Sequence, residues 1–72
     1  MALRIRDLRE DNDLTQAEAA ALLNVSQATY SRYETGTLAI PYSLLEILAD
    51  HYKTSVDYLL GRTGNPKPYP PK

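Results

Sequence analysis

The chain has 72 residues, no cysteine and a formal net charge of −1. This length corresponds to one small domain, close to the lower limit for a core without disulfides or metals. The lack of cysteine excludes disulfides, thiolate zinc sites and cysteine nucleophiles, and it fits a reducing compartment. No apolar run approaches the length of a signal peptide or a transmembrane helix. We therefore expect a cytoplasmic protein that does not contact membranes.

The acidic balance weighs against nucleic-acid binding, because nucleic-acid modules are usually basic. Four carboxylates crowd one short segment near the N-terminus: Asp7, Glu10, Asp11 and Asp13. Binding to DNA would require these acids to lie away from the surface that meets the phosphates. A single copy would then bind weakly at physiological salt, which favours a dimer.

Hydrophobic spacing predicts an all-α chain, beginning with a helix over residues 3–12. A second helix is expected over residues 16–23, because Thr15 and Glu18 have the spacing of a capping box. Asn24 follows, at a turn that needs a residue tolerant of left-handed backbone angles. Small residues are expected on the inner face of this helix, where they would allow a close helix crossing: Ala17, Ala19, Ala20 and Ala21.

A third helix is expected over residues 27–35, between the N-cap candidate Ser26 and a left-handed Gly36. Tyr30 and Tyr33 repeat at helical spacing and are expected in the core, with the hydroxyl at its edge. The remaining positions are short, neutral or hydrogen-bonding, with one cation: Gln27, Ala28, Ser31 and Arg32. Such a surface suits base edges, so the two helices form the pattern of a helix-turn-helix.

Two more helices complete the expected bundle, over residues 41–52 and 56–60. Pro41 suits the first turn of the fourth helix, and Ser55 suits the N-cap of the fifth. We expect a domain over residues 1–61 followed by a flexible tail over 62–72, because the tail has four prolines and two lysines.

Residues 3–60 resemble the phage repressor and Cro helix-turn-helix family, also called the xenobiotic-response-element (XRE) family of transcriptional regulators. The resemblance implies a compact five-helix, lambda-repressor-like DNA-binding domain with the helix-turn-helix at helices two and three. It also implies a repressor rather than an activator, although the sequence leaves that choice open. The matching residues are Leu8, Arg9, Leu14, Thr15, Gln16, Ala20, Val25, Ser26, Gln27, Tyr33, Glu34, Gly36, Pro41, Leu45, Leu48, Ala49 and residues 55–60.

The third helix is expected to enter the major groove and contact bases through Gln27, Ala28, Ser31 and Arg32. Gln27 is the bidentate match for adenine, whereas Arg32 suits either a guanine or a phosphate. Ala28 offers only a methyl contact to thymine. The alternative is an ordinary solvated helix face.

Phosphate contacts are expected at the start of the second helix and around the third, from Thr15, Gln16, Thr29, Tyr33, Thr35, Gly36 and Thr37. Gln16 lies at the positive end of a helix dipole, which suits a phosphate, although a solvated glutamine is the alternative. The family often has a basic residue at the position of Thr37, so one contact is expected to be missing.

The resemblance further implies a structural ion pair between Arg9 and Glu34, with a phosphate contact from Arg9 as the alternative. A homodimer on a two-fold operator is expected to use Tyr58, Leu60 and Arg62, unless these residues only cover the edge of the core. No cofactor is expected, and one histidine, His51, gives no metal site.

A second function fits the acidic balance and the nearly uncharged third helix. This is a protein-binding module of the antitoxin or anti-repressor-binding type, for which DNA would not be the partner. Nothing in the sequence favours an enzyme, because there is no glycine-rich phosphate loop and no evident pair of catalytic acids.

Overall fold

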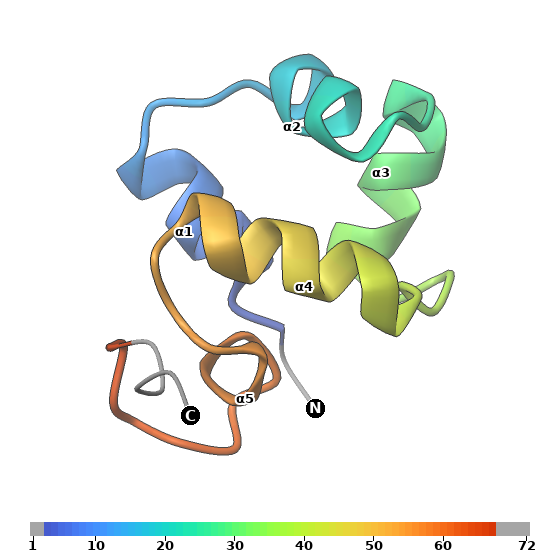
Figure 1. Cartoon of the computed structure of the whole chain (residues 1–72). Coiled ribbons are helices and arrows are strands. Elements are labelled where there is room, and N and C mark those ends of the chain that lie inside the picture. Colours follow the sequence, from blue (N-terminus) through green and yellow to red (C-terminus); the bar gives the residue numbers. More distant parts are fainter. Residues whose placement is uncertain (1–2, 68–72) are drawn as a thin grey trace.

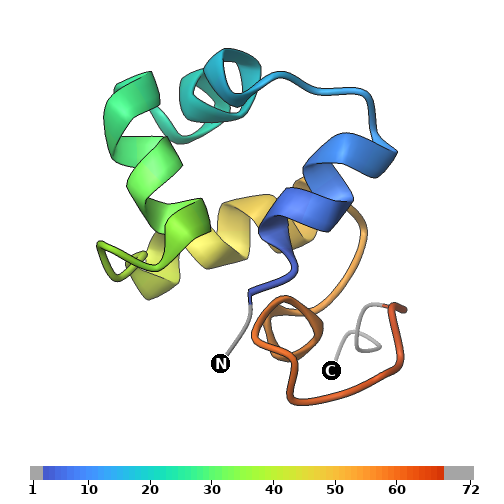
Figure 2. The same ribbon diagram turned by 180° about the vertical axis from the view of Figure 1, so that it is seen from behind.

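The computed structural model describes residues 3–67, and within them the chain forms five helices and no strand. Figure 1 shows α2 and α3 at one end, α4 across the middle and α5 at the other end. On the side shown in Figure 2, α1 lies between α2 and α5. The helices are α1 (Ile5–Asp11), α2 (Gln16–Leu23), α3 (Gln27–Thr35), α4 (Tyr42–His51) and α5 (Val56–Leu59).

The all-α prediction is confirmed, and the bounds predicted for α2 and α3 are those observed. The first helix begins later than predicted, because the Arg4 N–H donates to the Leu59 carbonyl at 2.9 Å and holds the entering chain beside α5. Pro41 precedes α4 as an N-cap with an extended ψ of 147°, whereas a position within the first turn was predicted. Its carbonyl still accepts from the Leu44 and Leu45 N–H groups in the first turn of the helix.

The predicted capping box of α2 is present. Thr15 Oγ1 accepts from the Glu18 N–H at 3.1 Å, and the Glu18 carboxylate accepts from the Thr15 N–H at 3.0 Å. That backbone hydrogen bond lowers the pKa of the Glu18 carboxyl. At the other end, Asn24 has a φ of 57°, so the turn into α3 uses the left-handed conformation that the sequence predicts.

The predicted ends of α3 are also confirmed. Ser26 Oγ accepts from the Thr29 N–H at 3.1 Å, which satisfies one of the unpaired donors at the helix start. Gly36 ends the helix with a φ of 79°. A Cβ at Gly36 would meet no atom within 4 Å, so the backbone angle rather than space favours glycine there.

The core is formed by side chains from all five helices, and it includes both tyrosines predicted to be buried. Of the four alanines in α2, Ala19 and Ala20 are buried, whereas Ala17 and Ala21 are exposed and were wrongly placed on the inner face. Successive helical residues are about 100° apart, so a run of alanines extends around the helix. The buried apolar residues are Ile5, Ala19, Ala20, Leu23, Tyr30, Tyr33, Leu45, Leu48, Ala49 and Leu59.

Two further helices end in left-handed residues that are not glycine. Asp13 follows α1 with a φ of 56°, and Lys53 follows α4 with a φ of 55°. After α4, the Thr54 N–H donates to the Ala49 carbonyl at 2.8 Å, which closes a Schellman-type turn. These turns satisfy carbonyls at the helix ends despite the unfavourable backbone angle.

The start of the predicted tail is attached to α5. The Arg4 guanidinium donates to the Thr63 carbonyl at 3.0 Å and lies 4.3 Å from the centre of the Tyr58 ring. The Arg62 N–H donates to the Asp57 carbonyl at 2.8 Å. The flexibility of the tail over residues 62–72 stays a prediction, and residues 68–72 of it lie outside the described residues. Over residues 3–67, no helix has the length and apolar character needed to cross a bilayer.

Candidate nucleic-acid interface

The outer face of α3 is open. In Figures 1 and 2 this helix lies at the edge of the molecule, with no other helix beyond it. Gln27, Ala28 and Arg32 are exposed on it, and Ser31 is half-buried. The side chains of Gln27 and Arg32 make no hydrogen bond or ion pair within residues 3–67, so their polar groups are available to a ligand.

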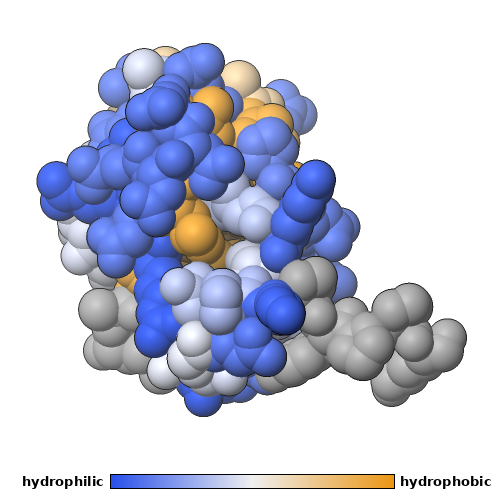
Figure 3. Space-filling model, turned by 90° about the vertical axis from the view of Figure 1, so that its left-hand side faces the viewer, coloured by the Kyte–Doolittle hydropathy of each residue, from blue (hydrophilic) through white to orange (hydrophobic). Residues whose placement is uncertain are grey.

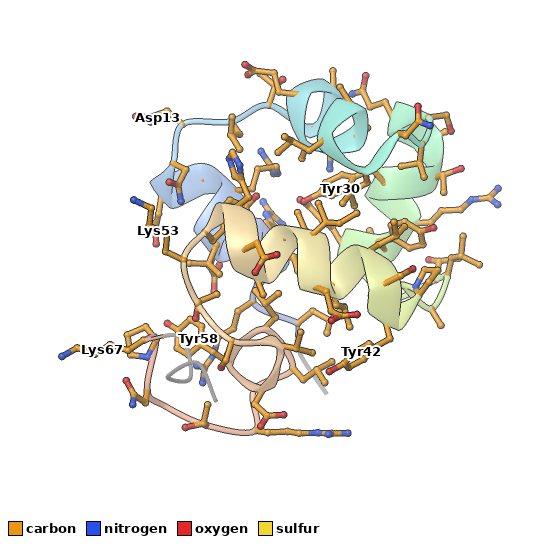
Figure 4. The ribbon with its side chains drawn as sticks, in the orientation of Figure 1. Asp13, Tyr30, Tyr42, Lys53, Tyr58 and Lys67 are labelled. Atoms are coloured by element: carbon orange, nitrogen blue, oxygen red, sulfur yellow. The ribbon has the colours of Figure 1, made fainter. Side chains whose placement is uncertain are left out.

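The inner face of α3 is packed against the core. Tyr30 is fully buried, and Figure 4 shows its side chain pointing into the molecule. Burial and the neighbouring Glu34 carboxylate raise the pKa of Tyr30 well above its usual range. Tyr33 is 5% exposed, so its predicted place in the core is confirmed. The phosphate contact predicted for Tyr33 has almost no accessible surface to use.

A buried ion pair joins α1 to the end of α3. Arg9 donates through Nε to Glu34 Oε2 at 2.6 Å and through Nη2 to Glu34 Oε1 at 3.2 Å. The side chains are only 12% and 3% exposed. The third nitrogen, Nη1, donates to the Leu14 carbonyl at 2.8 Å. All three guanidinium nitrogens therefore donate within the protein, which supports the structural assignment of Arg9 and opposes a phosphate contact.

The same carboxylate also holds the start of α2. Gln16 Nε2 donates to Glu34 Oε1 at 3.1 Å, so three helices meet at Glu34. Burial alone would raise the pKa of the Glu34 carboxyl, but the donors around it, with Arg9 first, lower the pKa below its ordinary value. The bond to Gln16 was not predicted, because it joins residues from two helices and leaves no signal in local spacing.

The remaining phosphate candidates border α3 from both ends. Thr15, Thr35, Gly36 and Thr37 are exposed and Thr29 is half-buried. Their hydroxyls are oriented by local hydrogen bonds, since Thr35 Oγ1 lies 3.0 Å from Thr37 Oγ1 and donates to the Arg32 carbonyl at 3.2 Å. The loop after α3 thus presents hydroxyl and backbone groups beside the open face.

The N-terminal acidic segment ends away from α3, as DNA binding would require, although Glu18 is exposed on the neighbouring α2. Asp13, at the end of the acidic segment, lies at the opposite side of the molecule from α3 in Figure 4. That side is largely hydrophilic in Figure 3. On α3 itself the one carboxylate is Glu34, which is buried and paired. The net charge of the chain therefore does not describe the charge on the open face of α3 itself.

The three residues predicted for a dimer lie together at α5, but they differ in exposure. Tyr58 is half-buried under the Arg4 guanidinium, and Leu60 is half-buried against the core. Arg62 is exposed, with Nη1 3.9 Å from the Asp57 carboxylate. His51 is exposed near the end of α4, and in the described part of the chain no group of three potential ligands could hold a metal.

A comparison with known protein families agrees with this fold, in which α2 and the open α3 are joined by a left-handed turn. The model of a family described as "Helix-turn-helix domain" matches residues 1–65. The chain belongs to this helix-turn-helix family.

Several curated proteins are similar to this helix-turn-helix domain. It is 38% identical over 65 residues to the uncharacterized HTH-type transcriptional regulator YobD of Bacillus subtilis, covering 90% of this chain and 58% of YobD. It is 39% identical over 57 residues to the cryptic phage CTXphi transcriptional repressor RstR of Vibrio cholerae, covering 79% and 51%. No solved structure gives a significant match.

A third relative is named as an antitoxin rather than as a transcriptional regulator. The antitoxin PezA of Streptococcus pneumoniae is 35% identical over 57 residues, covering 79% of this chain and 36% of PezA. The helix-turn-helix domain thus spans between 36% and 58% of the length of these three curated relatives. These relatives are named as regulators, a repressor and an antitoxin, and none of these names is that of an enzyme.

Proposed function

We propose that the protein binds double-stranded DNA in a sequence-specific manner and regulates transcription, as a repressor, in the cytoplasm. The observation that carries this proposal is the open face of α3, where Gln27, Ala28 and Arg32 are exposed on one helix of a helix-turn-helix. In such a motif the second helix lies in the major groove while the first crosses the backbone. The relatives named as transcriptional regulators support the same assignment.

Base contacts are assigned to the open face of α3, namely Gln27, Ala28, Ser31 and Arg32. Gln27 matches adenine, and Arg32 matches guanine. Phosphate contacts are assigned to the start of α2, the first turn of α3 and the loop after α3. These contacts are Thr15, Gln16, Thr29, Thr35, Gly36 and Thr37. Because phosphate contacts position a protein and base contacts specify the sequence, α3 would set the choice of site.

A homodimer fits the weak positive charge of the interface. Arg32 is the one cation on α2 and α3, so one copy neutralises few phosphates and binds weakly at physiological salt. Two copies joined near Tyr58, Leu60 and Arg62 would contact half-sites about 34–36 Å apart.

Selection of bound duplexes from a random pool tests the proposal. The full chain is immobilised, and the recovered duplexes are sequenced after several rounds at moderate salt. We expect one enriched motif with two-fold symmetry, whose half-sites are about one helical turn apart. Recovery of no motif, with retention that disappears as salt is raised, would contradict sequence-specific binding.

The similarity to an antitoxin favours one second candidate, a protein-binding module. This candidate predicts that a protein partner co-purifies with the chain from its source, while the selection experiment recovers no motif. The two outcomes separate the candidates.

A further inference from the structure

Two glutamines occupy the same position in neighbouring helices, but the protein holds the side chain of one of them. Gln16 and Gln27 are the first residues of α2 and α3. Gln27 is exposed, and its side chain makes no hydrogen bond within the described residues. Gln16 is half-buried, and its Nε2 donates to Glu34 Oε1 at 3.1 Å. The amide of Gln16 therefore has a fixed orientation before any ligand binds.

The Glu34 carboxylate determines which way this amide is turned. Its Oε2 accepts from Arg9 Nε at 2.6 Å, and its Oε1 accepts from Arg9 Nη2 at 3.2 Å as well as from Gln16. A carboxylate in this place attracts the NH2 end of the amide and repels its oxygen. Because the amide is planar, the second N–H of Gln16 Nε2 then has a set direction. This N–H remains for a ligand that accepts hydrogen bonds.

Gln16 is also the accessible end of this chain of contacts. The side chains of Glu34 and Arg9 are only 3% and 12% exposed, whereas Gln16 is half-buried. Arg9 Nη1 donates to the Leu14 carbonyl at 2.8 Å, so each nitrogen of the guanidinium already has an acceptor. A ligand that approaches the start of α2 would therefore meet the Gln16 amide rather than the ion pair beneath it.

We propose that Glu34 is a positioning residue for DNA binding, and that it holds the Gln16 amide so that the second N–H donates to a backbone phosphate. This inference rests on the proposed DNA-binding function. Glu34 belongs to α3 and lies two residues after Arg32. The carboxylate that orients α3 for base contacts would thus also orient a phosphate donor on α2, which keeps the two kinds of contact in register. A donor oriented in advance loses less conformational entropy on binding than a free side chain does.

NMR of the side-chain amides observes the proposed contact directly. In the isotopically labelled full chain without DNA, we expect the Nε2 protons of Gln16 to exchange with water more slowly than those of Gln27, because one of them is bonded to Glu34. Saturation with the duplex selected from the random pool should then shift the second Nε2 proton of Gln16. A Gln16 amide that exchanges like that of Gln27, or that does not shift with the duplex, would overturn the proposal.

Matched variants of the two glutamines separate a phosphate contact from a base contact. Gln16→Met keeps the length of the side chain and removes the amide. We expect it to weaken binding about tenfold for every duplex, because one hydrogen bond to a charged group is lost. The matched variant, Gln27→Met, should instead reduce the preference for the selected motif.

These two variants also distinguish failure of the proposal from failure of the proposed function. If Gln16→Met binds like the wild type while Gln27→Met loses its preference, the positioning proposal is wrong and the proposed function stands. If the wild type shows no preference among duplexes, both are wrong.

A shorter amide tests the positioning while the buried ion pair is left intact. In Gln16→Asn the side chain is one methylene shorter, so its amide cannot reach Glu34 and a phosphate together. We expect the slow exchange to disappear and binding to weaken about as much as in Gln16→Met, with the urea midpoint close to that of the wild type. An asparagine variant that lacks the bond to Glu34 and still binds like the wild type would overturn the positioning role.

A double-mutant cycle assigns the effect to Glu34 itself. Among folded molecules, Glu34→Gln should weaken duplex binding by a factor at least about threefold larger in the wild type than in Gln16→Met, because the two residues are coupled. Equal factors in the two backgrounds would make Glu34 a structural residue only. If Glu34→Gln does not fold, the asparagine variant and the amide exchange still decide the question.

Discussion

The inner and outer faces of α3 differ in what fixes their side chains. On the inner face, Tyr30 is fully buried and the Glu34 carboxylate accepts hydrogen bonds from Arg9 and Gln16 of two other helices. On the outer face, Gln27 and Arg32 are exposed, and their side chains make no hydrogen bond within the described residues. One helix therefore has a face that sets its orientation and a face that is free for contact.

The comparison extends to the two ion pairs of α1. The Arg9–Glu34 pair is 12% and 3% exposed, whereas the Arg6–Glu10 pair, at 3.2 Å, is 67% and 54% exposed. Removing one partner of a buried pair leaves an unpaired buried charge, whereas an exposed pair is replaced by water. The two pairs should therefore differ greatly in their effect on folding.

The largest effect is expected from Glu34→Gln. It leaves the Arg9 guanidinium buried without its carboxylate, which should reduce the free energy of unfolding by about 3–5 kcal/mol. Urea unfolding followed by circular dichroism measures this change. The matched control, Glu10→Gln, should cost less than about 1 kcal/mol because that pair is exposed. Similar losses in both variants would show that the inner face does not hold α3.

A change on the outer face should affect binding instead of folding. Arg32→Ala is expected to weaken binding to the selected duplex by about 1–3 kcal/mol and to relax the preference at one base pair, if Arg32 contacts a guanine. The urea midpoint should hardly change, because Arg32 is exposed. Fluorescence anisotropy with single-base variants of the duplex measures the preference. A uniform loss over all sequences would instead make Arg32 a phosphate contact.

The inner face should also give the domain an acid-sensitive stability. The pKa of Glu34 in the folded protein is lowered from its ordinary value of 4.5. Its contribution to stability is therefore present above about pH 4.5 and is lost as the pH falls through the lower folded value. Urea unfolding measured at a series of acidic pH values should show this loss. The Glu34→Gln variant should show a weaker dependence, and an unchanged dependence would assign the effect to other carboxylates.

The smallest effect is expected at the end of α4, away from both faces. Lys53 adopts a φ of 55°, which is unfavourable for a residue with a Cβ. Lys53→Gly should raise the free energy of unfolding by roughly 0.5–1 kcal/mol, because glycine adopts this angle without the steric cost. Lys53→Ala is the control, since it removes the charge and keeps the Cβ. Equal urea midpoints for the two variants would refute the explanation.

Local signals in the sequence were sufficient for much of the fold. The capping box of Thr15 and Glu18, the left-handed Asn24 and the glycine at 36 each depend on residues a few positions apart, and all are present. By contrast, the left-handed angle of Lys53 could not be predicted from its residue type, because lysine does not favour that conformation. The closing hydrogen bonds of the turn, rather than the residue itself, determine that angle.

The candidate site was predicted less completely, because part of it depends on tertiary contacts. The family resemblance indicated the Arg9–Glu34 pair, but the hydrogen bond from Gln16 to the same carboxylate joins positions 18 residues apart. Burial of Tyr33 was predicted together with a phosphate contact, and the structure leaves little surface for the second role. The exposure of Ala17 was missed because an alanine run gives no clear inner face.

The measurement that tests the account most directly compares specificity with stability in one variant. Gln27→Ala combined with Arg32→Ala changes only the open face of α3. For the wild type, we expect the selected duplex to bind about 10³-fold or more tighter than a scrambled duplex of the same length. In the double variant this ratio should fall close to one while the urea midpoint is unchanged. A ratio that stays high in the folded double variant would contradict the claim that α3 specifies the DNA sequence.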